Sequence, residues 1–319
     1  MIKVGIIGAR QEDAGELLRI LIHHPETDII SLHAPAFAGR SVAACHHGFI
    51  GEEIVSFSDS IDPSALDVLF IAEDSEAADD IVQRAEEWPG LHIIDMSARR
   101  MHRLAAGGFE YGLSEINRKP LVRGARLAVV PTPAAALAMI ALHPLALNQL
   151  IDSDLEISVA APADMAASLD PGAIATEIAT MIAKSQTGYS GKVHVRIIPS
   201  DMTRTMRVLT MMKSPLSIEE VDNLFETIYD DHNFVFTSLS QIDNSEVEGT
   251  QKCIVCFDKP GAGLLALETV GDSHMRGGAG DATHVMNLFF ALDEKVGLTL
   301  KPSVFGRRSD SEQHTSWFA

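Results

Sequence analysis

Apolar residues follow two different patterns along this chain, and the pattern changes near the middle. Up to about residue 130, short apolar runs alternate with segments of helical spacing, as in Ile2–Ile7 followed by Ala14–His24. A continuous run such as Asp67–Ala72 is typical of a strand buried on both faces of a parallel sheet. The pattern therefore predicts βαβ units in a Rossmann-like, doubly wound parallel sheet. Its other expected elements are strands at Asp28–Leu32, Leu91–Ile94 and Leu127–Val130 and helices at Ser75–Glu87 and Ala134–Leu147.

Beyond residue 150 the pattern favours strands that are broken by only a few helices. Ser217 followed by Glu220 is a capping box, which predicts the start of a helix over Ser217–Tyr229. The pattern indicates an α+β second domain that is inserted before a C-terminal helix returning to the first domain. Its expected strands are Leu155–Ala160, Lys192–Ile198, Met206–Met211, Asn233–Phe236, Gln251–Phe257 and Gly263–Thr269, and its other helix is Gly172–Lys184.

These elements predict four segments in the 319 residues. Residues 1–148 form a domain of the dinucleotide-binding type, and 149–277 form an α+β domain of the substrate or dimerisation type. Residues 278–300 carry the helix that packs back on the first domain, and 301–319 form a polar tail.

Composition narrows the class of protein and its partners. No run approaches the roughly 18 apolar residues of a membrane span, and the first residues do not read as a signal peptide. The formal charge of −19 disfavours nucleic acids and anionic membranes as partners. Three cysteines in a long chain predict reduced thiols and a cytoplasmic location. Cys253 and Cys256 lie in a strand pattern and are expected to be buried thiols, so no metal site is predicted.

Several segments, in order, resemble the N-acetyl-gamma-glutamyl-phosphate reductases, within the wider aspartate-semialdehyde-dehydrogenase-like group. The most specific is Tyr111-Gly-Leu-Ser-Glu-Ile-Asn-Arg118, which is close to the family signature Y-G-L-P-E-L-N-R. The segments Ala14–Arg19, Phe37–His47, Ile94–Ala98 and Gly278–Leu298 match further family motifs. The resemblance covers roughly residues 1–298 and implies the family's two-domain fold and a homo-oligomer, a dimer or tetramer.

The family reaction, as the resemblance implies it, is the reduction of an acyl phosphate to an aldehyde. A cysteine thiolate expels phosphate to form a thioester, NADPH delivers hydride, and a histidine handles the protons. Ungapped matching places the cysteine position on Pro133 and the histidine position on Ile198. The weak substitutes nearby are Thr132, which we expect to be the N-cap of a helix, and His194, which shares a strand face with Ile198.

The cofactor loop also departs from the family pattern G-A-T-G-Y-T-G-G. Here it reads Gly8-Ala-Arg-Gln-Glu-Asp-Ala-Gly15, with two of the glycines replaced and two carboxylates added. A pyrophosphate needs close approach of the backbone and a helix N-terminus without competing negative charge. The sequence therefore predicts no bound cofactor, with NADP as the alternative. If NADP binds, the residues implied are Gly8, Arg10, Gly15 and Arg40.

Polar residues that match the family elsewhere are candidates for binding a small acidic metabolite, because arginine binds carboxylate or phosphate bidentately. The alternative is structural: Glu115 and Arg118 would tie the domains together, and Arg204 would pair with Asp201. The candidate ligand-binding residues are Arg100, Tyr111, Glu115, Asn117, Arg204 and Arg207.

Three hypotheses follow. The first is a catalytically degenerate reductase homologue, a pseudoenzyme, that binds a small acidic metabolite or a partner subunit. The second is an active enzyme of altered chemistry that uses the same cleft. The third is a functional NADP-dependent reductase with a misaligned active site, for which Cys45, beside His46 and His47, is the only plausible thiol.

Overall fold

The computed structural model describes residues 1–302, which divide into two compact units. The first unit consists of residues 1–131 together with 277–299, and the second contains residues 132–276. Nearly all of the predicted tail at 301–319 lies outside the described residues.

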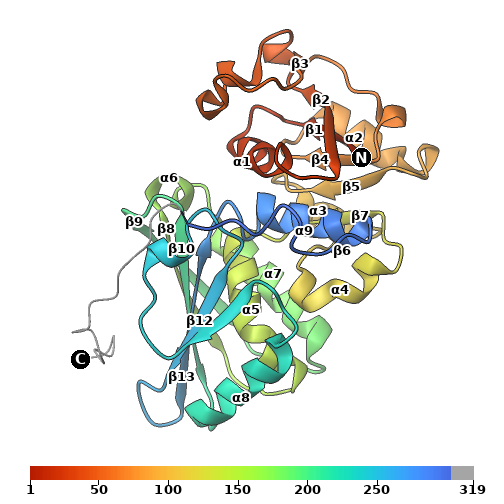
Figure 1. Cartoon of the computed structure of the whole chain (residues 1–319). Coiled ribbons are helices and arrows are strands. Elements are labelled where there is room, and N and C mark those ends of the chain that lie inside the picture. Colours follow the sequence, from red (N-terminus) through yellow and green to blue (C-terminus); the bar gives the residue numbers. More distant parts are fainter. Residues whose placement is uncertain (303–319) are drawn as a thin grey trace. The chain divides into compact units, whose positions relative to one another are not determined.

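The first unit is built on a seven-stranded sheet in which every neighbouring pair of strands is parallel (Figure 1). The strand order is β3-β2-β1-β4-β5-β7-β6. The chain runs outward from β1 to β3 and then returns to β4 on the other side of β1. This confirms the doubly wound sheet and creates a switch point at the carboxyl ends of β1 and β4. The strands are β1 (Ile2–Ile7), β2 (Thr27–His33), β3 (Phe57–Ser58), β4 (Val68–Ile71), β5 (His92–Asp95), β6 (Glu110–Tyr111) and β7 (Leu127–Val129).

Helices accompany this sheet, and the last of them comes from the far end of the chain. That helix, α9, packs against α1, α4 and β5, and all of its residues from Ala279 to Leu288 are buried. The predicted return of a C-terminal helix to the first unit is therefore confirmed. The helices are α1 (Glu12–Leu21), α2 (Glu76–Gln83), α3 (Arg100–Ala106), α4 (Ser114–Val122) and α9 (Ala279–Phe289), with short 3-10 turns at Pro35–Phe37, Val42–Ala44, His47–Phe49, Pro63–Ala65 and Ala85–Glu87.

The second unit contains a six-stranded mixed sheet with the order β11-β12-β13-β10-β8-β9. The outer pairs β11–β12 and β8–β9 are parallel, and the pairs between them are antiparallel. This arrangement confirms the α+β architecture. The strands are β8 (Leu155–Pro162), β9 (Val193–Ser200), β10 (Thr205–Lys213), β11 (Val235–Ser238), β12 (Cys253–Asp258) and β13 (Leu264–Asp272).

Helices cover one face of this sheet. α5 packs on β10 and β13, α7 on β9, and α8 on β11 and β12 (Figure 1). In β10, alternate residues from Met206 to Met212 are buried. We call the other side the open face. The capping box of Ser217 and Glu220 is present at the start of α8, as predicted. The helices are α5 (Pro133–Leu147), α6 (Ala163–Ala166), α7 (Pro171–Ser185) and α8 (Ile218–Tyr229), with a 3-10 turn at Asn244–Glu246.

The boundary between the units falls at Pro131, whereas the sequence pattern had placed it at 148. The difference is helix α5. Its residues 134–146 are all buried, and its neighbours are the second unit's sheet and α7. An Ala-rich helix that is apolar on every side can pack equally well on either unit, so periodicity alone does not assign it. Within residues 1–302, no helix is long and apolar enough to cross a membrane.

Candidate active site

The start of α5 is where the family resemblance implies a thiol. Thr132 is the N-cap and Pro133 is the first helical residue, as expected from the sequence. Pro133 has no nucleophilic atom. The Thr132 side chain makes no capping bond to its own helix, so the hydroxyl serves another purpose than the one we predicted for it.

That hydroxyl contacts a carboxylate from α7. Thr132 Oγ1 donates a hydrogen bond to Glu177 Oε2 at 2.8 Å, and the Thr132 backbone N–H donates to Glu177 Oε1 at 3.1 Å. Glu177 is only 3% exposed, while Thr132 is half-buried. The N-terminus of a helix favours a negative charge, and the Glu177 carboxylate supplies one here. Glu177 lies 45 residues after Thr132 in a helix with no motif of its own, so nothing in the sequence links the pair.

The loop between β1 and α1 lies at the switch point, where a dinucleotide pyrophosphate would rest. Gly8 has a φ of +75°, and a Cβ there would lie 2.3 Å from Glu73 Cβ, so only glycine fits. Gln11 Nε2 donates to Glu73 Oε1 at 2.8 Å and thereby joins the ends of β1 and β4. Glu12 and Asp13 begin α1. These residues do not fit a pyrophosphate, because the loop is bridged by the chain and bears carboxylates.

Residues of the following loop pack against the same turn. The His46 ring lies over Gly15, whose Cβ would come within 2.5 Å of Nδ1, and His46 Nε2 contacts Ala9 O at 2.8 Å. Cys45 Sγ lies 3.4 Å from Arg10 O. Gly15 is thus required because the His46 ring fills the space that a larger side chain would need. Cys45 is a half-buried thiol of the first unit, held against this loop.

The two basic residues predicted for NADP stay on the surface. Arg10 is exposed, and the Arg40 guanidinium stacks on the Phe37 ring with its central carbon 5.5 Å from the ring centroid. Neither arginine therefore forms part of a preorganised phosphate site.

The strongest family motif, Tyr111–Arg118, is a packing element of the first unit. Tyr111 is 1% exposed, and Gly112 lets the chain pass where a Cβ would lie 2.9 Å from Val129 O and 3.0 Å from Val285 Cγ2. Asn117 Nδ2 donates to Tyr111 O at 3.0 Å and to Glu110 Oε2 at 3.2 Å. These contacts shape the turn from β6 into α4.

The same motif ties α4 to α9 and to the segment that follows α9. Ser114 Oγ lies 2.7 Å from His284 Nδ1, and His284 Nε2 lies 2.9 Å from Glu294 Oε2. Arg118 Nε donates to Glu294 Oε1 at 2.6 Å. The hydrogen bond from His284 and the Arg118 charge lower the pKa of Glu294 to about 2. Arg118 thus pairs within its own unit, and His284 and Glu294 are polar residues that sequence reasoning missed.

Glu115 is a buried neighbour of this network. Ligand atoms of Glu115, Asp281 and His284 lie within 4.8 Å of one another. Both ring nitrogens of His284 are already hydrogen-bonded, to Ser114 and Glu294. The imidazole therefore serves to join α4 and α9.

The arginines after β5 are engaged in holding α3. Arg103 pairs with Asp95 and with Asp79, and Arg99 also pairs with Asp79 at 2.8 Å. Arg100, the predicted ligand-binding residue, donates from Nη1 to the Met96 carbonyl. Arg100 therefore ties the start of α3 to the segment that follows β5.

Arg204 is held by a carboxylate other than the one considered from sequence. Arg204 Nε donates to Asp272 Oδ2 at 2.8 Å, and Asp201 plays no part in this pair. Asp272 is fully buried and also accepts from the backbone N–H groups of Gly249 at 2.7 Å and His274 at 2.9 Å. The Arg204 side chain remains 32% exposed. Asp272 orients this guanidinium while leaving it reachable from solvent.

Arg207 points to the open face of the second unit's sheet. It donates to Glu268 Oε1 at 2.9 Å, to Asn244 Oδ1 at 3.0 Å and to the carbonyl of Ile242. All three nitrogens of its guanidinium are engaged in these contacts. Arg207 fastens the segment around residues 242–244 onto the sheet.

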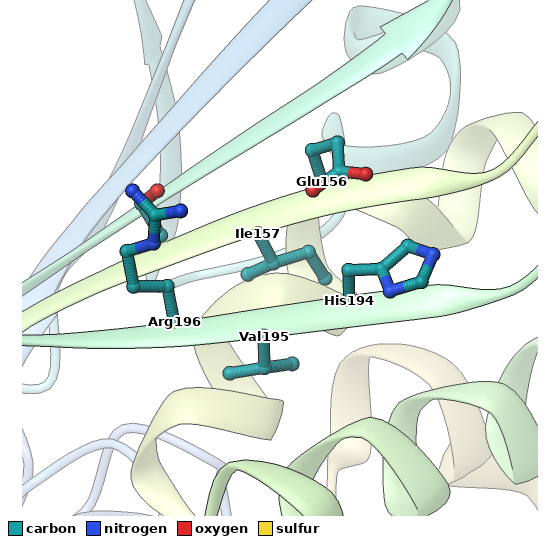
Figure 2. A pocket seen from close by; sticks show the side chains of 6 residues that line it. Glu156, Ile157, His194, Val195 and Arg196 are labelled. Atoms are coloured by element: carbon teal, nitrogen blue, oxygen red, sulfur yellow. The ribbon is translucent and has the colours of Figure 1, made fainter.

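His194 and Ile198 lie on the open face, away from α5 and α7. A shallow pocket of about 390 Å³ opens between β8 and β9 and is lined by Glu156, Ser158, His194 and Arg196, as well as by Ile157 and Val195. Figure 2 shows Glu156, His194 and Arg196 on the side of the strands opposite the helices. Since Glu177 lies on α7, beneath the other face, His194 does not reach the Thr132 hydroxyl.

The two closely spaced cysteines, Cys253 and Cys256, point to opposite faces of β12, because their positions along the strand differ by three, an odd number. Cys253 is buried and Cys256 is half-buried. Burial and the neighbouring Glu268 and Asp258 carboxylates raise the pKa of Cys256 to about 11, so this thiol stays protonated and unreactive near neutral pH.

Comparison with known proteins gives consistent matches. Residues 3–123 match the family model described as semialdehyde dehydrogenase, NAD binding domain. N-acetyl-gamma-glutamyl-phosphate reductase of Bacteroides thetaiotaomicron is 30% identical over 325 residues, covering 96% of this chain and all of the relative. The protein of that name from Azobacteroides pseudotrichonymphae is 31% identical over 321 residues, with the same coverage of both chains.

Solved structures show the same fold at low identity. Aspartate semialdehyde dehydrogenase II of Vibrio cholerae, complexed with ASA, has a TM-score of 0.71 and 14% identity, covering 91% of this chain and 98% of that one. Aspartate semialdehyde dehydrogenase with NADP from Candida albicans has a TM-score of 0.67 and 13% identity, covering 93% and 99%.

Proposed function

The chain belongs to the N-acetyl-gamma-glutamyl-phosphate reductase family, and from that premise we propose that it binds a small acidic metabolite or a partner without reducing an acyl phosphate. The observation that carries this proposal is Pro133 at the first residue of α5. A thioester route needs a sulfur nucleophile at the acyl carbon, preferably with the lowered pKa of a helix N-terminus. Proline offers no such atom, and the helix N-terminus already contacts the Glu177 carboxylate.

The cofactor loop supports the same proposal. The Gln11–Glu73 hydrogen bond links β1 to β4 at the switch point, and Glu12 and Asp13 place negative charge at the start of α1. A dinucleotide would have to break this bridge and approach these carboxylates. We therefore propose that NADP binds weakly at most.

Arg204 supports the binding of an acidic ligand. Its guanidinium is oriented by Asp272 and is partly exposed, which suits recognition of a carboxylate or phosphate. The compound in the relatives' name, N-acetyl-gamma-glutamyl phosphate, carries two such groups, namely the carboxylate of its glutamyl part and its phosphate.

We further propose a homo-oligomer, with the open face of the second unit's sheet as the contact surface. The half-buried side chains of Leu209 and Met211 lie on that face, together with Glu156 and Arg196 of opposite charge. A surface that carries both apolar and oppositely charged groups can pair with a copy of itself around a two-fold axis. Light scattering on the wild type and on Met211→Asp tests this, with loss of the larger species expected in the variant.

The test of function combines binding and turnover. Thermal shift assays should show stabilisation by N-acetyl-L-glutamate and a smaller or absent shift with NADPH, since a ligand at a hundred times its Kd contributes about 2.7 kcal/mol. NADPH oxidation with N-acetyl-γ-glutamyl phosphate should not exceed the rate without protein. A Gln11→Gly, Glu73→Ala double variant removes the bridge and should gain stabilisation by NADPH.

Oxidation of NADPH by the protein would contradict the proposal. Serine variants of the cysteines would then identify which alternative holds. If Cys45→Ser abolished that turnover, the chain would be a functional reductase with an unusual thiol. If turnover survived serine at Cys45, Cys253 and Cys256 together, the chain would be an active reductase of altered chemistry.

A further inference from the structure

The Thr132–Glu177 contact has the geometry of a nucleophile and its base. Thr132 Oγ1 lies 2.8 Å from Glu177 Oε2, within the roughly 2.6–3.2 Å at which a base can take a proton from a hydroxyl. The second oxygen of Glu177 accepts the Thr132 backbone N–H at 3.1 Å, which fixes the orientation of the carboxylate. The Thr132 hydroxyl therefore donates to a carboxylate whose orientation is fixed by the backbone N–H of Thr132.

The surroundings also suit such a pair. Glu177 is 3% exposed and is therefore shielded from water, whereas Thr132 is half-buried and can meet a ligand. The N-terminal end of α5 carries the positive end of the helix dipole, and once a transferred proton has neutralised Glu177, this end favours the negative charge that develops on an attacked acyl oxygen. Thr132 immediately precedes the position at which the family resemblance implies attack on an acyl phosphate.

We propose that Thr132 and Glu177 form a nucleophile–base pair that hydrolyses acyl phosphates. This inference rests on the proposed function, in which the chain binds the family's acidic ligands but transfers no hydride. An acyl phosphate needs no reductant to be hydrolysed, so the reaction is complete with water alone.

The reaction has two balanced steps. Thr132 Oγ1 attacks the acyl carbon and its proton passes to Glu177. The bond from that carbon to the phosphate oxygen then breaks, and Glu177 passes the proton to the departing phosphate, which leaves an acyl ester on Thr132, free phosphate and an ionised Glu177. Water then attacks the same carbon and gives a proton to Glu177. The carbon–Oγ1 bond breaks, Oγ1 regains a proton from Glu177, and the carboxylic acid is released.

A structural tether between α5 and α7 would use the same two hydrogen bonds, so the test must separate the roles. We would measure phosphate release from N-acetyl-γ-glutamyl phosphate, and from acetyl phosphate as a second probe, against hydrolysis in buffer. Wild-type protein should release phosphate well above the buffer rate. Thr132→Val and Glu177→Gln should each lower that excess at least about a hundredfold, while Thr132→Ser should retain it.

Thr176→Val is the matched control. Thr176 lies next to Glu177 on α7, is exposed, and donates its hydroxyl to the Gly172 carbonyl, so the rate should be unchanged. Melting temperatures of all variants distinguish a lost reaction from a lost fold. Mass spectrometry after rapid acid quench should find an acyl group on the peptide that contains Thr132, which a tether would never acquire.

Two results would overturn the inference. One is wild-type phosphate release no faster than in buffer with both probes. The other is full activity in folded Thr132→Val. Neither result affects the proposed absence of NADPH oxidation, which is measured separately by absorbance. Conversely, NADPH oxidation would refute the proposed function whatever the rate of hydrolysis.

Discussion

At the scale of single residues, the carboxylate of Asp272 holds the partly exposed guanidinium of Arg204 in place. It is fully buried and accepts hydrogen bonds from Arg204 and from the backbone N–H groups of Gly249 and His274. A buried charge is stable only where such donors replace water. Arg204 and Asp272 lie 68 residues apart, so the pair depends on the alignment of β10 with β13.

Replacing Asp272 by asparagine should destabilise the protein by about 2 to 3 kcal/mol, because amide hydrogens would face backbone donors that need an acceptor. Urea unfolding followed by circular dichroism measures the loss. Asp201→Asn is the control, since Asp201 is exposed and lies near Arg204 in sequence; its effect should stay within about 0.5 kcal/mol. Equal stability of the two variants would show that Asp272 does not hold Arg204 in solution.

At the scale of helices and strands, elements with a long apolar pattern were predictable from the sequence, whereas short polar elements were not. β1 has the predicted bounds, and α8 begins at its predicted capping box. α3 and α4 were missed, since α3 is short and basic while α4 contains Pro120 and non-helical angles at Asn117. Their stability comes from partners elsewhere in the chain, such as Asp79 for α3 and His284 for α4.

The candidate site was predictable only in part, for the same reason. Pro133 and Thr132 were located because they precede a long apolar helix whose start the sequence marks. Glu177 and Asp272 were not, because a carboxylate on a helix or strand is normally solvated, and only the fold brings it to its partner. Local sequence patterns predict helices and strands, whereas side-chain pairs between distant segments become visible only in the folded structure.

Helix α5 carries a buried histidine that makes the second unit sensitive to acid. Burial, with a smaller contribution from His232, lowers the pKa of His143 to about 4. The unfolded chain therefore binds a proton more readily than the folded one, so stability is full at neutral pH and falls as pH drops below about 6.5. Between pH 7.5 and pH 5 this group alone should lower the free energy of unfolding by about 2 kcal/mol.

His143→Leu should reduce this loss, because leucine does not titrate. The measurement is the free energy of unfolding at both pH values for wild type and variant. The control is His194→Leu, which makes the same replacement at an exposed histidine on the open face. An unchanged slope in His143→Leu would mean that His143 is not buried as a neutral group.

At the scale of the whole molecule, the first unit is discontinuous in sequence. Residues 1–131 supply its sheet, and 277–299 supply α9, whose residues fill the space beside α1, α4 and β5. The buried pair of His24 Nε2 and Asn287 Oδ1, 3.0 Å apart, joins the two segments, as do the contacts of His284. Without the other segment, each would leave buried polar groups without these hydrogen-bond partners.

A protein comprising residues 1–131 alone should therefore lack a cooperative thermal transition and should bind a hydrophobic dye. Adding a synthetic peptide of residues 277–299 should restore a transition whose midpoint rises with peptide concentration. The same peptide with Asn287→Leu should be less effective, because His24 would lose its partner. Cooperative unfolding of the fragment without peptide would show that α9 is dispensable.

The late arrival of α9 has a consequence during synthesis. A ribosome that has made the strands of the first unit must add about 150 further residues before α9 emerges, which takes roughly 8 to 30 s at ~5–20 residues per second. Throughout that interval the nascent sheet exposes apolar side chains, while the unit encoded second can already complete its own core. We expect the amino-terminal half to depend on chaperones, and the order of maturation to run opposite to the order of translation.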